Sequence, residues 1–352
     1  MSRADRVCAR FEEIDALLVS GLVNVRYLTG FSGTNALCVL APSIRRFVTD
    51  FRYVERARGE VDGFDQERAP PDFLAALEQG WPAGALRLGF EDHVMTVREH
   101  ARVRELLPDR IELVAAGGLV EKERAVKEAG ELERIRAAAA LADEAFEAVV
   151  GEGLVGRSER AVALAIEDAL RMRGAEPAFG AIVAAGANGA LPHASARAVE
   201  IAANQLVTID WGALLDGYNS DCTRTVATGD VDGELRELYE LVRQAQAAAL
   251  EALRPGPEGR EVDAVARELI GAAGHAEHFG HGLGHGVGLE VHEAPRLATT
   301  ASDRLQAGNV VTVEPGVYVP GLGGVRIEDL VAVGDAGVDV LSSLPKALQS
   351  VA

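Results

Sequence analysis

The sequence predicts two domains: an α/β domain over residues 1–124 and an α+β domain over residues 125–352. The chain has 352 residues, more than a single hydrophobic core usually supports. Its first part alternates short apolar runs of strand length with helical segments. Its second part opens on a long helical pattern and then places strand-like runs and glycine-rich turns between further helices.

The N-terminal elements follow from apolar runs that are bounded by turn-forming residues. The runs IDALLVS, ALCVLA and RRFVTD predict strands, and amphipathic segments between and after them predict helices. Strands are therefore expected at 14–20, 36–41 and 45–50, and helices at 53–60, 72–80 and 96–107. This alternation indicates a mostly parallel or mixed sheet. The part contains no glycine motif that would cradle a phosphate, and we expect no chemistry there.

The C-terminal part carries four helical patterns and five strand-like runs. Helices are expected at 121–150, 158–173, 233–253 and 261–273. Strands are expected at 178–185, 204–210, 218–228, 309–319 and 325–333. Hairpins packed with helices give an α+β domain. The turn RPGPEG separates the last two helices, because proline and glycine end helices.

Charge and composition exclude several classes of protein. The net charge is −19; residues 1–124 hold 17 basic and 20 acidic side chains, and the remainder holds 18 and 34. This acidity argues against a nucleic-acid partner. No stretch approaches the roughly 18–20 apolar residues of a membrane helix, and the first residues do not resemble a signal peptide. We therefore expect a cytoplasmic protein with no membrane partner.

Three cysteines, Cys8, Cys38 and Cys222, are an odd number without a close pair. This argues against a disulfide framework and against a zinc–thiolate site. They are expected to be small buried hydrophobes.

Two aspartates flank a predicted hairpin in NQLVTIDWGALLDGYNSDCTRTVAT (204–228). If Asp216 and Gly217 form the turn, Asp210 and Asp221 become diagonal neighbours on one face, roughly 7–8 Å apart. Like charges at that spacing call for a cation, and side chains from there can reach a site of two metal ions. The alternative is a pair of turn-region aspartates that face solvent.

Two further segments carry candidate ligands. HFGHGLGHGVGLEVHEAPR (278–296) places four histidines among five glycines, and glycines let the backbone approach a ligand closely; any single histidine there is otherwise a structural residue. In GNVVTVEPGVYVPGLGGVRIEDLVAV (308–333), Glu314 ends an apolar strand and Glu328 lies inside another. A buried glutamate is costly unless it is paired or metal-bound. The alternative is a surface ion pair of Arg326 and Glu328 on an edge strand.

Together, DWGALLDGYNSDCTRT, HGLGHGVGLEVHE and VEPGVYVPGLGGVRIED resemble the pita-bread metallopeptidases, which include prolidase, aminopeptidase P and methionine aminopeptidase. AIVAAGANGALPHAS (181–195) fits as well, and VNVRYLTGFSGTNALCVL (23–40) is similar to the creatinase-type N-terminal domain. The resemblance therefore covers essentially the whole chain and implies a creatinase-type N-terminal domain followed by a pita-bread catalytic domain. The N-terminal domain argues against methionine aminopeptidase.

The resemblance implies a role for each residue at a matching position. The metal ligands would be Asp210, Asp221, His285, Glu314 and Glu328. Glu314 would also shuttle protons, His292 would stabilise the oxyanion, and His193 would orient the proline side of the substrate. Arg326 matches the arginine beside the last ligand, His281 would line the proline pocket, and Thr223 would support a ligand. Two small departures from the family pattern, Trp211 and Asn309, touch no ligand role.

The activity so implied is hydrolysis of the Xaa-Pro bond by a site with two divalent metal ions. Four carboxylates and one imidazole favour Mn²⁺ or Co²⁺, with Zn²⁺ as an alternative. Arg296 matches a position where some prolidases capture the carboxylate of a dipeptide, which favours an Xaa-Pro dipeptidase; the alternative for this residue is a solvated loop arginine. The alternatives for the protein are an aminopeptidase P acting on longer peptides, an inactive peptide-binding relative, and a metal-free hydrolase like creatinase. The substrate would be a proline-containing di- or oligopeptide, and the resemblance implies a homodimer.

Overall fold

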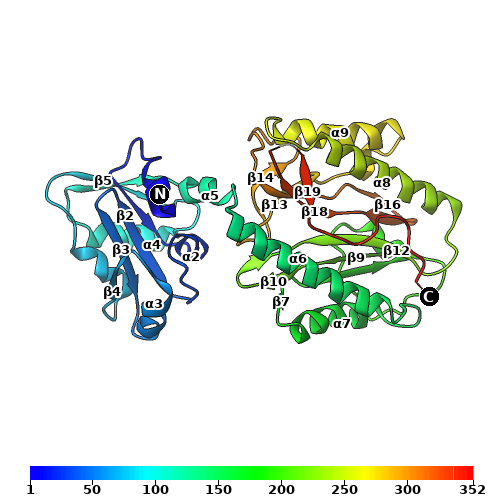
Figure 1. Cartoon of the computed structure of the whole chain (residues 1–352), viewed down its shortest axis with the longest axis horizontal. Coiled ribbons are helices and arrows are strands. Elements are labelled where there is room, and N and C mark those ends of the chain that lie inside the picture. The colour runs from blue at the N-terminus through cyan, green and yellow to red at the C-terminus, as the bar shows by residue number, and fades with distance from the viewer. Residues whose placement is uncertain (336, 352) are drawn as a thin grey trace. The chain divides into compact units, whose positions relative to one another are not determined.

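The computed structural model describes residues 1–335 and 337–351. Its chain divides into two compact units, Met1–Arg124 and Ala125–Ala352 (Figure 1). Among the described residues, no helix has the length and apolar character needed to cross a membrane.

The first unit is built on a mixed six-stranded sheet in the order β4-β3-β2-β1-β5-β6. Strand β1 pairs antiparallel with β2 and parallel with β5, so the prediction of a mixed sheet is confirmed. The strands are β1 (Ala16–Val19), β2 (Ala36–Ala41), β3 (Ile44–Thr49), β4 (Asp65–Arg68), β5 (Leu86–Phe90) and β6 (Ile111–Ala115). The helices are α1 (Arg3–Cys8), α2 (Leu22–Thr29), α3 (Val54–Glu60), α4 (Val97–Leu106) and α5 (Leu119–Arg124). The helix expected at 72–80 is instead a 3₁₀ helix, η1 (Phe73–Glu78).

The second unit places helices on both sides of layered strands (Figure 1). Its helices are α6 (Ala129–Val150), α7 (Glu159–Met172), α8 (Gly233–Ala252) and α9 (Gly259–Ala272), with 3₁₀ helices η2 (Gly186–Ala190) and η3 (Ala276–His278). One group of strands is β7 (Glu176–Pro177), β8 (Ile182–Ala185), β9 (Leu206–Trp211), β10 (Ala213–Leu215), β11 (Tyr218–Asn219) and β12 (Cys222–Ala227). The other group is β13 (Gly284–Gly286), β14 (Glu293–Leu297), β15 (Val310–Val313), β16 (Gly316–Val319), β17 (Gly323–Arg326), β18 (Asp329–Val333) and β19 (Val338–Val340).

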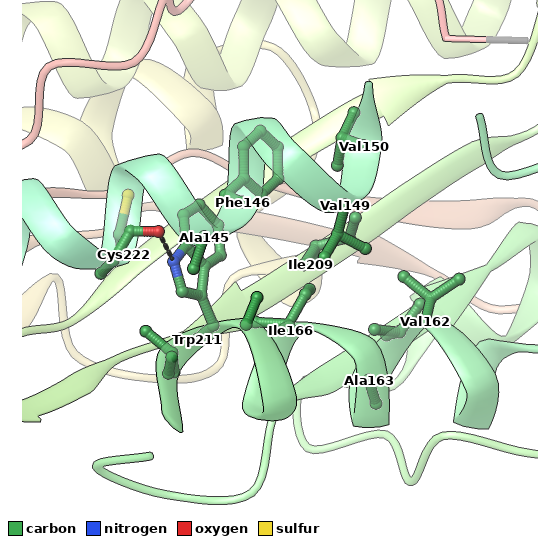
Figure 2. Packing of buried hydrophobic residues seen from close by; sticks show 14 of the residues in the cluster. Ala145, Phe146, Val149, Val150, Val162, Ala163, Ile166, Ile209, Trp211 and Cys222 are labelled. Atoms are coloured by element: carbon green, nitrogen blue, oxygen red, sulfur yellow. Dashed lines mark hydrogen bonds between the residues drawn. The ribbon is translucent and has the colours of Figure 1, made fainter. Parts of the chain in front are cut away.

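Helices α6 and α7 pack on the sheet β12-β9-β8 and enclose the first core of this unit. Figure 2 shows Phe146 and Trp211 within this core. Their rings stack at a centroid distance of 4.3 Å, and the Trp211 indole N–H donates to the Ala142 carbonyl at 2.8 Å. The indole therefore joins β9 to α6 through both packing and a satisfied polar group.

A second core lies between helices α8 and α9 and the sheet β14-β13-β15-β18-β19. Strand β17, which pairs with β16, adds Val325 to the same core. Each half of the unit thus has two helices that cover its own strands. The space between the halves is where the candidate residues converge.

The prediction of one helix over 121–150 is wrong, because the structure has α5 and α6 with a break at residues 125–128. The backbone in the break bonds outside the helix: the Ala125 carbonyl accepts from the Asn309 side chain at 2.8 Å, and the Lys127 N–H donates to the Gly308 carbonyl at 2.8 Å. These tertiary bonds override the helical propensity of the segment.

Three predicted strands are each split in two, and a predicted ligand lies at every break. The run 218–228 is interrupted at Ser220–Asp221, 309–319 at Glu314–Pro315, and 325–333 at Ile327–Glu328. The run 178–185 is also shorter than expected, since β8 begins only at Ile182. At an interruption the backbone leaves its sheet, so the side chain is freed from strict alternation.

Candidate active site

A single cavity of about 610 Å³ in the second unit gathers the candidate residues. Its lining includes every side chain that was predicted from the sequence to bind metal, bind substrate or take part in catalysis: His193, Asp210, Asp221, His281, His285, His292, Arg296, Glu314, Arg326 and Glu328. The apolar part of the lining includes Phe179, Ile182 and Val291. A cavity of this size accommodates a small ligand.

The hairpin that carries Asp210 and Asp221 has the predicted register. Asp216 and Gly217 both have positive φ, at 50° and 84°, as a type I′ turn requires. Leu215 faces Tyr218. Thr223 faces Asp210, so the same register holds on both sides of the gap between β11 and β12. Asp221 is buried and Asp210 is partly buried, which excludes the alternative of two solvent-facing turn aspartates.

Glu328 is held by three consecutive residues at the start of β12. The Thr223 hydroxyl donates to Glu328 Oε2 at 2.7 Å, and the Glu328 N–H donates to the Thr223 carbonyl at 3.1 Å. The Cys222 thiol lies 3.5 Å from the Glu328 carbonyl, which also accepts from Arg224. The other carboxylate oxygen, Oε1, is buried and has no hydrogen-bond partner among the described residues. This leaves one oxygen of Glu328 available to a ligand.

His285 is presented by the short strand β13, between two glycines that allow the neighbouring strands to pack closely. A Cβ on Gly284 would lie 2.0 Å from the Thr312 carbonyl oxygen, and one on Gly286 would lie 2.2 Å from that of Ala294. The His285 Nδ1 lies 3.1 Å from the Gly286 carbonyl, so the neutral form of the ring carries its proton on Nδ1 and its lone pair on Nε2. A ring nitrogen oriented in this way is suited to binding a cation.

The His285 Nε2 faces two carboxylates. It lies 3.3 Å from Glu314 Oε1 and 3.7 Å from Asp221 Oδ2. Glu314 Oε1 also accepts from the Thr312 hydroxyl at 3.0 Å. Asp221, His285 and Glu328 form a group whose nearest ligand atoms all lie within 4.8 Å of one another. All three side chains are buried.

Burial and mutual repulsion strongly perturb these acids. Burial raises the pKa of Asp221 well above its ordinary value, and the charges of Glu328, Asp210 and Glu314 raise it further. The pKa of Glu328 is likewise raised, by burial and then by Glu314 and Asp210. Glu314 differs: burial raises its pKa, but the hydrogen bond with His285 and nearby positive charge lower it to about 2. Such a group of acids is the environment that a cation stabilises.

The predicted alternative of a surface pair between Arg326 and Glu328 is wrong. Both side chains are buried, and Arg326 instead contacts Asp210, with Nη2 at 2.6 Å from Oδ2. Its Nε donates to the Thr223 hydroxyl at 3.0 Å. The break at Ile327–Glu328 takes Glu328 out of the strand that carries Arg326, so their predicted shared face does not exist. The second oxygen of Asp210, Oδ1, is buried without a hydrogen-bond partner in the part of the chain that the structure describes.

The remaining candidates surround this centre. The rings of His285 and His292 lie 4.2 Å apart, and burial and the positive charges of His285 and Arg296 lower the pKa of His292. His193 and Arg296 are exposed at the cavity. The Arg296 side chain makes no hydrogen bond or ion pair with any residue within 1–335 and 337–351. Its guanidinium is therefore available to a ligand.

Two residues of the centre were missed by the sequence analysis. The Tyr318 hydroxyl lies 2.9 Å from His281 Nε2 and accepts from Arg326 Nη1 at 2.9 Å. Thr312 supports both His285 and Glu314, since its hydroxyl also accepts from the His285 N–H at 3.0 Å. Thr312 shares the strand alternation of Glu314, which could have identified it. Tyr318 lies beyond the break, where no alternation signal leads to it.

These residues fit a divalent cation. The donor set is carboxylate oxygen and imidazole nitrogen, which suits divalent metal ions. One buried oxygen each of Asp210 and Glu328 has no hydrogen-bond partner among the described residues. Without a bound cation, these two oxygens would destabilise the folded protein. The structure brings Asp221, His285 and Glu328 within coordination reach of one another, whereas one oxygen of Asp210 is engaged by Arg326.

The chain is similar to known proteins over nearly its whole length. It is 41% identical over 337 residues to an uncharacterized peptidase of Bacillus subtilis, with 95% of each chain covered. It is 36% identical to an Xaa-Pro dipeptidase of Pyrococcus horikoshii, with 95% of this chain and 94% of that protein covered. Among solved structures, an Xaa-Pro dipeptidase from Bacillus anthracis has a TM-score of 0.94 at 37% identity, with 99% of each chain covered. An X-Pro aminopeptidase from Thermotoga maritima has a TM-score of 0.90 at 31% identity, covering 99% of this chain and all of that one.

Two family descriptions match separate parts of the sequence. Residues 5–126 match the creatinase/prolidase N-terminal domain, and residues 133–335 match metallopeptidase family M24. The second match covers more than half of the chain and contains every candidate residue. The protein is therefore a member of metallopeptidase family M24 that carries a creatinase/prolidase N-terminal domain.

Proposed function

We propose that this protein is an Xaa-Pro dipeptidase that uses two divalent metal ions, Mn²⁺ or Co²⁺, with Zn²⁺ as an alternative. The ligands would be Asp210, Asp221, His285, Glu314 and Glu328. The observation that carries the proposal is that all five line one cavity while buried oxygens of Asp210 and Glu328 are unpartnered among the described residues.

The bound ions would supply an acidified water and stabilise negative charge that develops on the substrate. Glu314 would accept the proton of the attacking water and pass it to the leaving nitrogen. His292 would donate a hydrogen bond to the oxyanion. His193 would orient the proline side of the substrate, and His281 would line the proline pocket.

Proline suits this kind of site for a physical reason. The bond before proline is a tertiary amide without an N–H, so a peptidase that relies on that donor loses a contact. A dedicated pocket supplies the missing recognition. Relatives with the same two-domain organisation are called Xaa-Pro dipeptidases, which supports this substrate class.

The choice of dipeptides rests on Arg296. Its side chain lines the cavity and makes no hydrogen bond or ion pair with any described residue, and an arginine fork matches a carboxylate. A dipeptide presents its free carboxylate one residue after the scissile bond, whereas a longer peptide presents an amide there. Arg296 would therefore favour the short substrate.

The test compares hydrolysis of Ala-Pro and Ala-Pro-Ala by the protein loaded with Mn²⁺, Co²⁺ or Zn²⁺. We expect faster cleavage of Ala-Pro, and a raised KM for it in Arg296→Met. The matched control is Arg254→Met, an exposed arginine away from the cavity, which should match the wild type. Faster cleavage of Ala-Pro-Ala would overturn the dipeptidase assignment.

An aminopeptidase acting before proline on longer peptides is the second candidate. The similarity to the Thermotoga maritima X-Pro aminopeptidase, at 31% identity over the whole chain, favours it. The same substrate series decides between the two. An inactive peptide-binding relative would show no hydrolysis with any of the metals, and a metal-free hydrolase would keep its activity in a chelator.

We also propose that the protein works in the cytoplasm as a homodimer. Its cysteines Cys8, Cys38 and Cys222 are free thiols, in keeping with a reducing compartment. The homodimer is supported by resemblance to the family. Light scattering of the purified protein tests it, and a monomer at micromolar concentration would contradict it.

A further inference from the structure

A buried ion pair lies directly behind Glu328. Arg224 Nη2 is 2.8 Å from Asp329 Oδ1, and the two side chains are 2% and 0% exposed. Arg224 follows Thr223, whose hydroxyl holds the Glu328 carboxylate, and Asp329 follows Glu328 in the chain. Both members of the pair are therefore one residue away from the contact that orients a proposed ligand.

Arg224 fixes the backbone at the point where the strand is interrupted. Its Nη1 donates to the Glu328 carbonyl and, at 3.0 Å, to the Thr223 carbonyl. Glu328 lies in the gap between β17 and β18, so its carbonyl has left the regular ladder of either sheet. The guanidinium replaces the missing ladder partner and sets the direction in which the Glu328 side chain leaves the chain.

A C-terminal segment, residues 342–346, completes the surroundings of this pair. The Leu344 carbonyl accepts from Arg224 Nη2 at 2.8 Å, and the Pro345 carbonyl accepts from Arg224 Nε at 3.2 Å. The Lys346 ammonium lies 2.6 Å from the second oxygen of Asp329, to which Gln246 also donates at 2.8 Å. Every nitrogen of the buried guanidinium and both oxygens of Asp329 are thus engaged.

A buried pair satisfied in this way gives little net stability by itself. Replacement by apolar side chains of similar volume is often neutral for folding, so stability alone does not account for such a costly arrangement. Its position offers another account, since groups that orient metal ligands commonly tune metal affinity.

We propose that Arg224, Asp329 and Lys346 are positioning residues that hold Glu328 in place for metal binding, with segment 342–346 as the clamp that keeps them aligned. The inference rests on the proposed metal ligands. The cation in question is the divalent metal ion of the proposed function. Lys346 acts at the outer end of the chain of contacts, because its side chain is 32% exposed, and it can be changed without opening the core.

The experiment measures the Kd for Mn²⁺ by titration calorimetry on metal-free protein. Lys346→Met removes the charge and keeps the alkyl stem, and we expect Mn²⁺ to bind about tenfold more weakly. Lys346→Arg, which restores a cation, should recover most of the affinity. Asp329→Asn should weaken binding further, by about 100-fold, since it leaves Arg224 without its anion.

The matched control is Arg136→Met. Arg136 pairs with Asp339 of β19 and so also ties the C-terminal part to a helix, but it contacts neither Glu328 nor Asp329. Its Kd should equal that of the wild type. Circular dichroism on each metal-free variant ensures that only folded protein is compared.

The outcomes separate the two proposals. If folded Lys346→Met and Asp329→Asn bind Mn²⁺ as tightly as the wild type, the positioning role is overturned. If Lys346→Arg is as weak as Lys346→Met, the charge is not what acts, and the proposal fails as well. If the wild type binds neither Mn²⁺, Co²⁺ nor Zn²⁺, it is the proposed function that fails.

Discussion

The ammonium of Lys127 lies 2.5 Å from Glu293 Oε1, and the two side chains are only 1% and 5% exposed. Lys127 belongs to the break between α5 and α6, and Glu293 directly follows His292. The segment that enters the catalytic unit is therefore tied to the loop that carries the proposed oxyanion donor.

Lys127→Met should destabilise the protein, because it removes the ammonium that pairs with the buried Glu293 carboxylate. The loss expected for breaking a buried pair is about 3–5 kcal/mol, measured as the shift of the urea unfolding midpoint. Lys122→Met, at an exposed lysine, should change the free energy of unfolding by less than about 0.5 kcal/mol. Equal shifts in the two variants would contradict the interpretation of a buried pair.

Asp221→Asn should make the metal-free protein more stable while it abolishes metal binding. Burial and the neighbouring carboxylates raise the pKa of Asp221, so a neutral amide relieves both penalties. Each kcal/mol relieved corresponds to about 2–4 °C in melting temperature, read by calorimetry in a chelator. A metal-free variant that melts below the wild type would refute this prediction.

The raised pKa of Asp221 also makes the free energy of unfolding of the metal-free wild type depend on pH. A carboxyl whose pKa is raised in the folded state binds its proton more tightly there than in the unfolded chain. Its contribution is fully present below the unfolded pKa of about 3.9 and is lost as the pH rises through the folded pKa. The free energy of unfolding without metal should therefore fall over this interval, and by less in Asp221→Asn.

Glu159→Gln should loosen the loop that carries His193. The buried Glu159 carboxylate accepts from the Ala185 N–H at 2.9 Å and from Arg197, with Nη2 at 2.8 Å, and so joins the two ends of this loop. Hydrogen bonds to a charged group contribute about 1.5–3 kcal/mol. We expect a loss of that order at pH 7 and a lower kcat/KM.

The effect of Glu159→Gln should depend on pH. Burial raises the pKa of Glu159, but the bonds from Arg197 and Ala185 outweigh it and lower the pKa overall. Its stabilisation is thus present above the unfolded pKa of about 4.3 and is lost as the pH falls through the folded pKa. Wild type and variant should converge in acid, while Glu152→Gln, at an exposed glutamate, should match the wild type throughout.

Trp211→Phe should destabilise the first core of the catalytic unit. The change removes the indole bond to Ala142 and part of a ring that stacks on Phe146, at a cost of about 2 kcal/mol. Trp81→Phe is the control, because Trp81 makes a similar bond to the Leu77 carbonyl but is only partly buried. A larger loss in Trp81→Phe, measured by chemical denaturation, would contradict the importance of the stacked indole.

The sequence permitted the hairpin register to be predicted because local rules govern it. Asp216 and Gly217 specify a turn of two residues, and the alternation then places Asp210 relative to Asp221 without any knowledge of the rest of the fold. The candidate cavity residues were found through short motifs with unusual composition. Their convergence needed the resemblance, because spacing alone does not bring distant segments together.

The strand breaks could not be predicted in the same way. The runs around Asp221, Glu314 and Glu328 keep their apolar character when the chain passes from one sheet to the next, so the pattern contains no signal of the change. The break near Lys127 was missed for a related reason, since its partners Gly308 and Asn309 lie far away in the chain. Tyr318 was missed because its role is to contact Arg326. Strand alternation had placed Arg326 on the same face as Glu328, and the structure does not.

The proposed ligands are divided between two separate sheets. Asp210 belongs to β9 and Asp221 precedes β12 in one sheet, whereas His285 belongs to β13 and Glu328 precedes β18 in the other. A ligand bound by all of these side chains would cross-link the two sheets. Loss of the bound ligand should therefore loosen the contact between the two sheets before either sheet unfolds.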